Sequence, residues 1–138
     1  MKNETNLTHF EALISGQIEN DYGIQDDLLG PELTSGLRNN LLMAYEQGKM
    51  QPAAIGRNSN HHTNELIRKD LTLWLDKEST DPFEKSFLSK IEEFVGYLNA
   101  TCYTGINDFE FHYALYDVGS FYKRHRDQFR SNAGRKYS

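Results

Sequence analysis

The sequence predicts an α+β fold in which helices pack on one face of a sheet. Two observations support this class. Apolar residues recur every three or four positions in three long segments, as they do on the buried side of an amphipathic helix. Between Asn107 and Tyr116, in contrast, apolar and polar residues alternate, which is the pattern of a half-buried strand. A chain of 138 residues suits one domain with its own core.

The first helix is expected from Thr5 to Ile18, with Gly16 as its end. The segment from Asp21 to Leu29 then predicts a short strand followed by a turn. A second helix begins at Pro31, because proline fits the first helical position, and Gly48 closes it. Its buried stripe consists of Leu33, Leu37, Leu41, Leu42 and Tyr45.

Two extended segments and a loop are expected next. Gln51 to Gly56 is predicted to be extended, and a polar loop from Arg57 to Asn64 contains the adjacent pair His61 and His62. Neighbouring histidines on a loop seldom converge on one metal ion, so we interpret this pair as loop residues. A strand is expected from Leu71 to Trp74, with the Trp74 side chain in the core.

The third helix has a strong start signal. Asp81 is a suitable N-cap, Pro82 fits the first position, and Glu84 stands where a capping-box carboxylate belongs. Gly105 punctuates the loop that follows. The apolar stripe of this helix, which is expected to pack on the sheet, consists of Phe83, Phe87, Leu88, Ile91, Phe94, Val95 and Leu98.

The alternating strand from Asn107 to Tyr116 has two different faces. One face is apolar and would meet the helices, whereas the other carries His112 and Tyr116 and would face a polar interior. Asp117, before Val118 and Gly119, is expected to be a turn residue. The apolar face consists of Phe109, Phe111, Tyr113 and Leu115, and the opposite face of Glu110, His112, Ala114 and Tyr116.

Composition and charge restrict the function classes. The net charge is −5, but the segment from Phe121 to Ser138 carries six basic residues and one acidic residue. This asymmetry predicts an anionic partner or a basic pocket for an anionic small molecule. The single cysteine, Cys102, excludes an internal disulfide and favours a reducing, cytoplasmic location. No apolar run has the length of a membrane span, so we expect no membrane partner.

The candidate chemistry lies in the motif His125-Arg126-Asp127. In an extended segment, the side chains two positions apart lie on the same face, so His125 and Asp127 would lie side by side. An imidazole and a carboxylate in this arrangement are two of the three ligands of a facial iron(II) site.

The wider sequence adds a family resemblance. The run FEFHYALYDVGSFYKRHRDQFR resembles the prolyl 4-hydroxylase-like branch of the iron(II)/2-oxoglutarate-dependent dioxygenases. The segments Ala54–Arg57, Ile67–Asp70 and Trp74–Asp76 look like the lead-in of its bacterial members. The resemblance covers the chain from about Tyr22 to Ser138.

This resemblance implies cofactors and site residues. His125 and Asp127 match the first two iron ligands, and Tyr116 matches a tyrosine that lines the 2-oxoglutarate pocket. Fe(II), 2-oxoglutarate and ascorbate are the implied cofactors, and a protein or peptide with a prolyl residue is the implied substrate.

Three further residues are placed at the substrate pocket by the resemblance. Tyr122 matches an aromatic residue beside the substrate entrance, and Arg135 falls on the strand edge that leads to the pocket mouth. His112 shares the face of Tyr116 and would line the pocket wall. The alternative for His112, a hydrogen-bonded inward histidine without a role in the reaction, stays open.

The resemblance also implies the architecture. Residues 1–138 would form a single domain that is the N-terminal part of a double-stranded β-helix, or jelly roll, with supporting helices. The distal iron histidine and the basic residue that pairs with 2-oxoglutarate are expected from strands beyond Ser138, so the barrel is expected to be incomplete. Its open edge would favour strand-mediated self-association.

A function from another class is the alternative. The basic segment Lys123–Lys136, together with the interleaved aromatic residues Phe121, Tyr122 and Phe129, would let a non-catalytic binding module engage nucleic acid or an acidic protein. We expect the dioxygenase rather than this module, and therefore no nucleic-acid partner.

Overall fold

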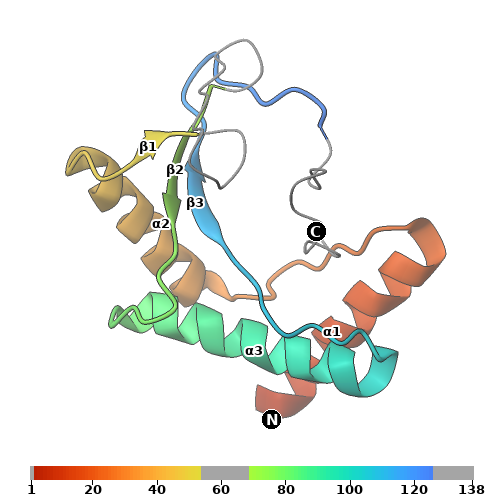
Figure 1. Cartoon of the computed structure of the whole chain (residues 1–138). Helices are drawn as coiled ribbons and strands as arrows, with labels where there is room; N and C mark the ends of the chain where they lie inside the picture. Colours follow the sequence, from red (N-terminus) through yellow and green to blue (C-terminus); the bar gives the residue numbers. More distant parts are fainter. Residues whose placement is uncertain (1, 54–68, 126–138) are drawn as a thin grey trace. The chain divides into compact units, whose positions relative to one another are not determined.

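Three helices and a three-stranded antiparallel sheet form the regular structure of residues 2–53 and 69–125, which are the residues that the computed structural model describes (Figure 1). This mixed content confirms the predicted α+β class, while the jelly-roll barrel stays a prediction. In chain order, the elements are α1 (Lys2–Asn20), α2 (Pro31–Glu46), β1 (Gln51–Pro52), β2 (Leu71–Trp74), α3 (Pro82–Cys102) and β3 (His112–Leu115).

The chain divides into two compact units. The first consists of Met1–Asn40 and Leu75–Glu110, and it contains α1, α3 and the first turns of α2. The second consists of Leu41–Trp74 and Phe111–Ser138, and it contains the end of α2 and the sheet. The prediction of a single domain over residues 1–138 stays a prediction.

In the first unit, α1 is longer than the sequence predicts because Gly16 does not end it. The helix continues to Asn20, and Asp21 follows with a positive φ of 66°. A Cβ atom at Gly16 would lie 3.0 Å from the Cα atom of Gly23. Gly16 therefore allows the next segment to fold back closely on the helix, which is a packing role that looks like a stop signal in the sequence.

The core of the first unit is aromatic. The ring of Phe10 is almost fully buried, and its centroid lies 4.8 Å from that of Phe94 and 5.7 Å from that of Tyr97. The Tyr97 hydroxyl donates to the Glu11 carboxylate, and this hydrogen bond raises the pKa of Tyr97. These contacts join α1 to α3, so Phe94 of the predicted apolar stripe packs on a helix within this unit. The packing of the stripe on the sheet stays a prediction.

A polar network joins the same two helices to the loop between α1 and α2. The Lys90 ammonium donates to the Asn6 side-chain oxygen at 3.0 Å and to the Leu28 carbonyl at 2.8 Å. The Asn6 amide in turn donates to the Glu93 carboxylate at 3.2 Å. The segment from Asp21 to Leu29 is thus held as an irregular loop, and the predicted short strand there is wrong.

The start of α3 agrees with its sequence signals. The Asp81 carboxylate accepts from the backbone N–H groups of Phe83 and Glu84, both at 2.9 Å. Glu84 closes the capping box through a relay, since the Ser79 hydroxyl donates to Glu84 and accepts from the Asp81 N–H. The predicted cap is confirmed, with Ser79 as an additional member.

The pKa of Asp81 reflects this cap. Burial alone would raise it. The hydrogen bonds from the Glu84 N–H, the Asn40 side chain and the Phe83 N–H favour the carboxylate form, and together they hold the pKa of Asp81 below its ordinary value of 3.8.

Helix α2 begins and ends where the sequence predicts. Its end is a Schellman motif, in which Lys49 N–H donates to the Ala44 carbonyl at 2.9 Å and Gly48 N–H to the Tyr45 carbonyl at 3.0 Å. Gly48 has the positive φ, 66°, that this motif requires. The four leucines of the predicted stripe are half-buried and not fully buried. Its last position is wrong, because Tyr45 is exposed and Ala44 is buried beside it.

The sheet of the second unit has the order β1-β2-β3, and both pairs are antiparallel. Leu71 pairs with Leu115, and Trp74 with His112. The predicted strand from Leu71 to Trp74 is confirmed, whereas the strand expected from Asn107 to Tyr116 is restricted to His112–Leu115. Within the described ranges, no helix combines the length and the apolar character that crossing a bilayer requires.

Candidate functional site

The segment that leads to His125 contacts the residues just before β2 after β3 ends. Leu115 is paired with Leu71, and the Phe121 carbonyl accepts a hydrogen bond from the Lys69 N–H at 2.8 Å. Lys69 and Leu71 are only two residues apart on the partner segment. The residues between Leu115 and Phe121 therefore form an excursion, after which the chain continues in the same direction along that segment. After Leu115 the chain leaves β2, and at Phe121 it pairs with Lys69, just before that strand.

The excursion contains a turn of four residues, Asp117–Ser120. The Asp117 carboxylate accepts from the Val118 N–H at 2.7 Å, and the Asp117 carbonyl accepts from the Ser120 N–H at 2.8 Å. Gly119 has a φ of 80°, which a residue with a side chain rarely adopts. Asp117 is therefore the turn residue that the sequence predicts.

His125 is exposed, and its ring contacts a backbone carbonyl and an aromatic ring. Its Nδ1 atom lies 2.8 Å from the Lys123 carbonyl oxygen, and its ring is stacked on that of Tyr122 with centroids 3.6 Å apart and an interplanar angle of 14°. Because a carbonyl oxygen only accepts, Nδ1 must carry the proton of this hydrogen bond. The neutral ring then has its lone pair on Nε2.

This state of His125 fits a metal ligand. Metal-bound histidines are neutral and usually donate their other ring N–H to a carbonyl or carboxylate group, as His125 donates to Lys123. Asp127, the second predicted ligand, lies outside the described residues. Within residues 2–53 and 69–125, no group of three or more histidine, cysteine or acidic side chains could hold a metal ion.

Two further predicted site residues, His112 and Tyr116, lie in and directly after β3. Both are exposed. The His112 ring packs edge-to-face on Trp74, its partner in the register, with centroids 5.0 Å apart. Its Nδ1 atom lies 3.2 Å from the Tyr113 carbonyl.

Trp74 corrects one prediction and adds a residue to the face of His112. Its side chain is 46% exposed, so the expected core position is wrong. Strand alternation contains the signal that was missed: the register pairs Trp74 with His112, which places both on the face of Ala114. A core position is the general expectation for tryptophan, but here the face of the strand on which Trp74 lies determines its exposure.

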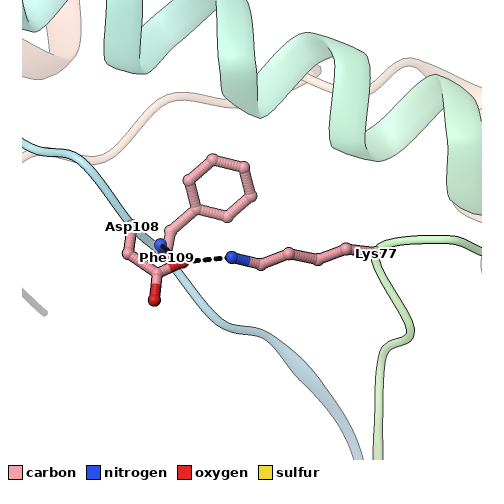
Figure 2. Close-up of polar contacts among 3 residues, drawn as sticks. All are labelled: Lys77, Asp108 and Phe109. Atoms are coloured by element: carbon pink, nitrogen blue, oxygen red, sulfur yellow. Dashed lines mark hydrogen bonds and ion pairs between the residues drawn. The ribbon is translucent and has the colours of Figure 1, made fainter.

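Lys77 contacts both Asp108 and Phe109 in the segment before β3, and we call these three residues the lysine clip (Figure 2). The Lys77 ammonium pairs with the Asp108 carboxylate and lies 4.8 Å from the centroid of the Phe109 ring. Asn99 fixes the preceding turn, since its side chain accepts from the Ile106 N–H and donates to the Ile106 carbonyl, both at 2.8 Å. Phe109 was predicted to lie on an apolar face, and its ring is in contact with the Lys77 ammonium group.

Several predicted residues lie outside the described ranges. They are Arg135, the loop pair His61 and His62, and most of the basic segment Lys123–Lys136, of which Lys123, Arg124 and His125 are described and exposed. The roles assigned to His125, Asp127, Tyr116, Tyr122, Arg135 and His112 therefore stay predictions.

The fold has a counterpart among solved structures. It is similar to a prolyl-4-hydroxylase from Pseudomonas putida. The TM-score is 0.76 and the sequence identity is 25%, over 86% of this chain. The match covers 61% of the length of that protein's chain. No model of a protein family and no curated protein matches the chain.

Proposed function

We propose that this chain is part of an Fe(II)- and 2-oxoglutarate-dependent dioxygenase that hydroxylates prolyl residues of a protein or peptide. The observation that carries the proposal is the fold similarity to a prolyl-4-hydroxylase over 86% of the chain. The tautomer and local contacts of His125 agree with it, because they suit a metal ligand.

The residues would divide the work as follows. His125 and Asp127 would hold Fe(II), leaving coordination positions for 2-oxoglutarate and oxygen. Fe(II), when bound, supplies the redox chemistry that couples the oxidation of 2-oxoglutarate to succinate and CO₂ with the insertion of one oxygen atom into a C–H bond. Tyr116 would orient 2-oxoglutarate, and the exposed face of His112 and Trp74 would lie along the pocket.

The architecture follows the same proposal. The sheet β1-β2-β3 would be one part of a jelly roll whose further strands complete the pocket, in keeping with a chain that spans 61% of the neighbour's length. The proposal extends to a cytoplasmic location, to ascorbate as an additional cofactor and to self-association through the outer edge of β3. None of these depends on the position of the metal ligands.

The test is succinate formation from 2-oxoglutarate in the presence of Fe(II) and a proline-containing peptide. We expect His125→Ala and Asp127→Ala to reduce succinate to the level without protein, since each removes one metal ligand. Asp26→Ala, which removes an exposed carboxylate on the loop before α2, is the matched control and should retain the activity.

Two outcomes would contradict the proposal. Succinate formation that survives both His125→Ala and Asp127→Ala would show that these residues do not hold the metal. No succinate from the unaltered protein, together with salt-sensitive binding of RNA that falls in Arg124→Ala, would favour the non-catalytic binding module.

A further inference from the structure

Tyr122 and His125 make a contact that their exposure does not require. His125 is exposed, and an exposed imidazole normally turns freely about its two side-chain torsions. Here the ring centroids are 3.6 Å apart with an angle of 14° between the planes. That separation is close to the thickness of one aromatic ring, so the two rings overlap almost fully.

The stack and the backbone hydrogen bond restrict different properties of the imidazole. The Tyr122 ring covers one face of His125 and fixes the plane of the imidazole. The Lys123 carbonyl, 2.8 Å from Nδ1, selects the tautomer with its proton on that atom. Because the Nε2 lone pair lies in the ring plane, stacking on the face does not compete with a ligand bond at Nε2.

We propose that Tyr122 is a positioning residue that holds the His125 ring in the orientation and tautomer of a metal ligand. This inference rests on the proposed function as far as the metal is concerned. It assigns Tyr122 a role in the metal site, whereas the family resemblance implies a place beside the substrate entrance. Pre-organisation of this kind lowers the entropy that the ring loses when a metal binds.

The role needs the aromatic ring of Tyr122 and not its hydroxyl group, because the ring is the part that stacks on His125. Tyr122→Phe should therefore behave as the unaltered protein does. Tyr122→Leu retains apolar bulk but has no flat face. Tyr45→Leu is the matched control, since Tyr45 is an exposed tyrosine on α2.

The first measurement is the tautomer of the metal-free chain, from long-range ¹H–¹⁵N NMR correlations of the imidazole rings, with His125→Gln used to assign the signals. We expect the Nδ1–H form in the unaltered protein, Tyr122→Phe and Tyr45→Leu. In Tyr122→Leu the plane of the ring is no longer fixed, so the imidazole can turn away from the Lys123 carbonyl, and we expect a mixture of both tautomers. An unchanged Nδ1–H form in Tyr122→Leu would overturn the positioning role.

The second measurement is the affinity for Co²⁺ alone, by isothermal titration calorimetry. We expect Tyr122→Leu to bind about tenfold to a hundredfold more weakly, as is common when a residue that orients a metal ligand is removed. Tyr122→Phe and Tyr45→Leu should retain the affinity. Equal affinity in Tyr122→Leu would overturn the inference.

These measurements also separate the two proposals. If Tyr122→Leu loses the Nδ1–H tautomer but the unaltered protein binds no Co²⁺, the metal role of His125 and the proposed function both fail, while the orienting effect on the ring is supported. If Co²⁺ binds equally to all variants and succinate is formed, the function stands and the inference about Tyr122 fails.

Discussion

Substitution of Gly36 by alanine should destabilise the protein, although the same change usually stabilises a helix. Gly36 is buried in α2, and a Cβ atom there would lie closer than 3.0 Å to three ring atoms of Phe83, at the start of α3. One of these atoms is Cγ, which is attached to the Phe83 Cβ and cannot swing away without a change of rotamer.

Two opposing terms set the size of the effect. Replacing glycine by alanine inside a helix contributes about 0.5–1 kcal/mol of stability. Forcing an additional methyl group into a packed contact costs about 1–3 kcal/mol. These ranges leave a net loss of roughly 0–2.5 kcal/mol, and we expect Gly36→Ala to lose about 1 kcal/mol, which corresponds to a decrease in Tm of about 3–5 °C.

Gly96 provides the matched control for this prediction. It lies in the interior of α3, is exposed, and a Cβ atom there would meet nothing within 4 Å. Gly96→Ala should therefore stabilise the protein by about 0.5–1 kcal/mol. Urea unfolding followed by circular dichroism measures both variants. The reasoning is refuted if Gly36→Ala is as stabilising as Gly96→Ala, or if Gly36→Ala remains destabilising when Phe83 is replaced by alanine.

Two further predictions concern the cap of α3 and the lysine clip. Asp81→Ala should cost about 1 kcal/mol at pH 7, and Asp81→Asn should cost little, because asparagine also caps helices. The folded-state pKa of Asp81 is lowered, so the stability that its charge contributes is complete above the ordinary pKa of 3.8 and is lost as the pH falls through the folded-state pKa. In urea unfolding, the difference in stability between the unaltered protein and Asp81→Asn should therefore shrink at pH 3 and below. Lys77→Met removes an exposed ion pair with Asp108 and a cation–π contact with Phe109, so it should cost less than about 1 kcal/mol in thermal unfolding, and Lys77→Arg should restore most of it. A loss in Lys77→Met that does not decrease with added salt would contradict the electrostatic part of this explanation.

Local sequence signals predict helix ends well where a residue type usually occurs at that position for a single structural reason. Pro31 and Gly48 bound α2, and Asp81 caps α3, because each residue satisfies a backbone requirement that its neighbours cannot meet. Gly16 shows the limit of such signals. A glycine also serves close packing, and its partner Gly23 is identified only when the chain folds back.

The candidate site was predictable in part. The alternation from Phe109 to Tyr116 places His112 and Tyr116 on one face, yet it does not show that Trp74 lies beside His112, because that contact depends on the register of β2 and β3. The environment of His125 was not predictable, since its contacts with Lys123 and Tyr122 depend on the local backbone path after the turn. The lysine clip joins residues that are 31 positions apart, and pattern reasoning has no signal for such a pair.

The turn at Asp117–Ser120 can change in length without moving the chain segment that follows it towards His125. Both ends of the turn are fastened to the same neighbouring segment, at Leu71 and Lys69, and Val118 at its tip is fully exposed. Inserted residues at Val118 would lengthen an exposed loop, and each doubling of loop length costs only about 0.6 kcal/mol. The turn is therefore a place where relatives can differ in length, and where a probe or a short peptide can be inserted, while Phe121 stays hydrogen-bonded to Lys69.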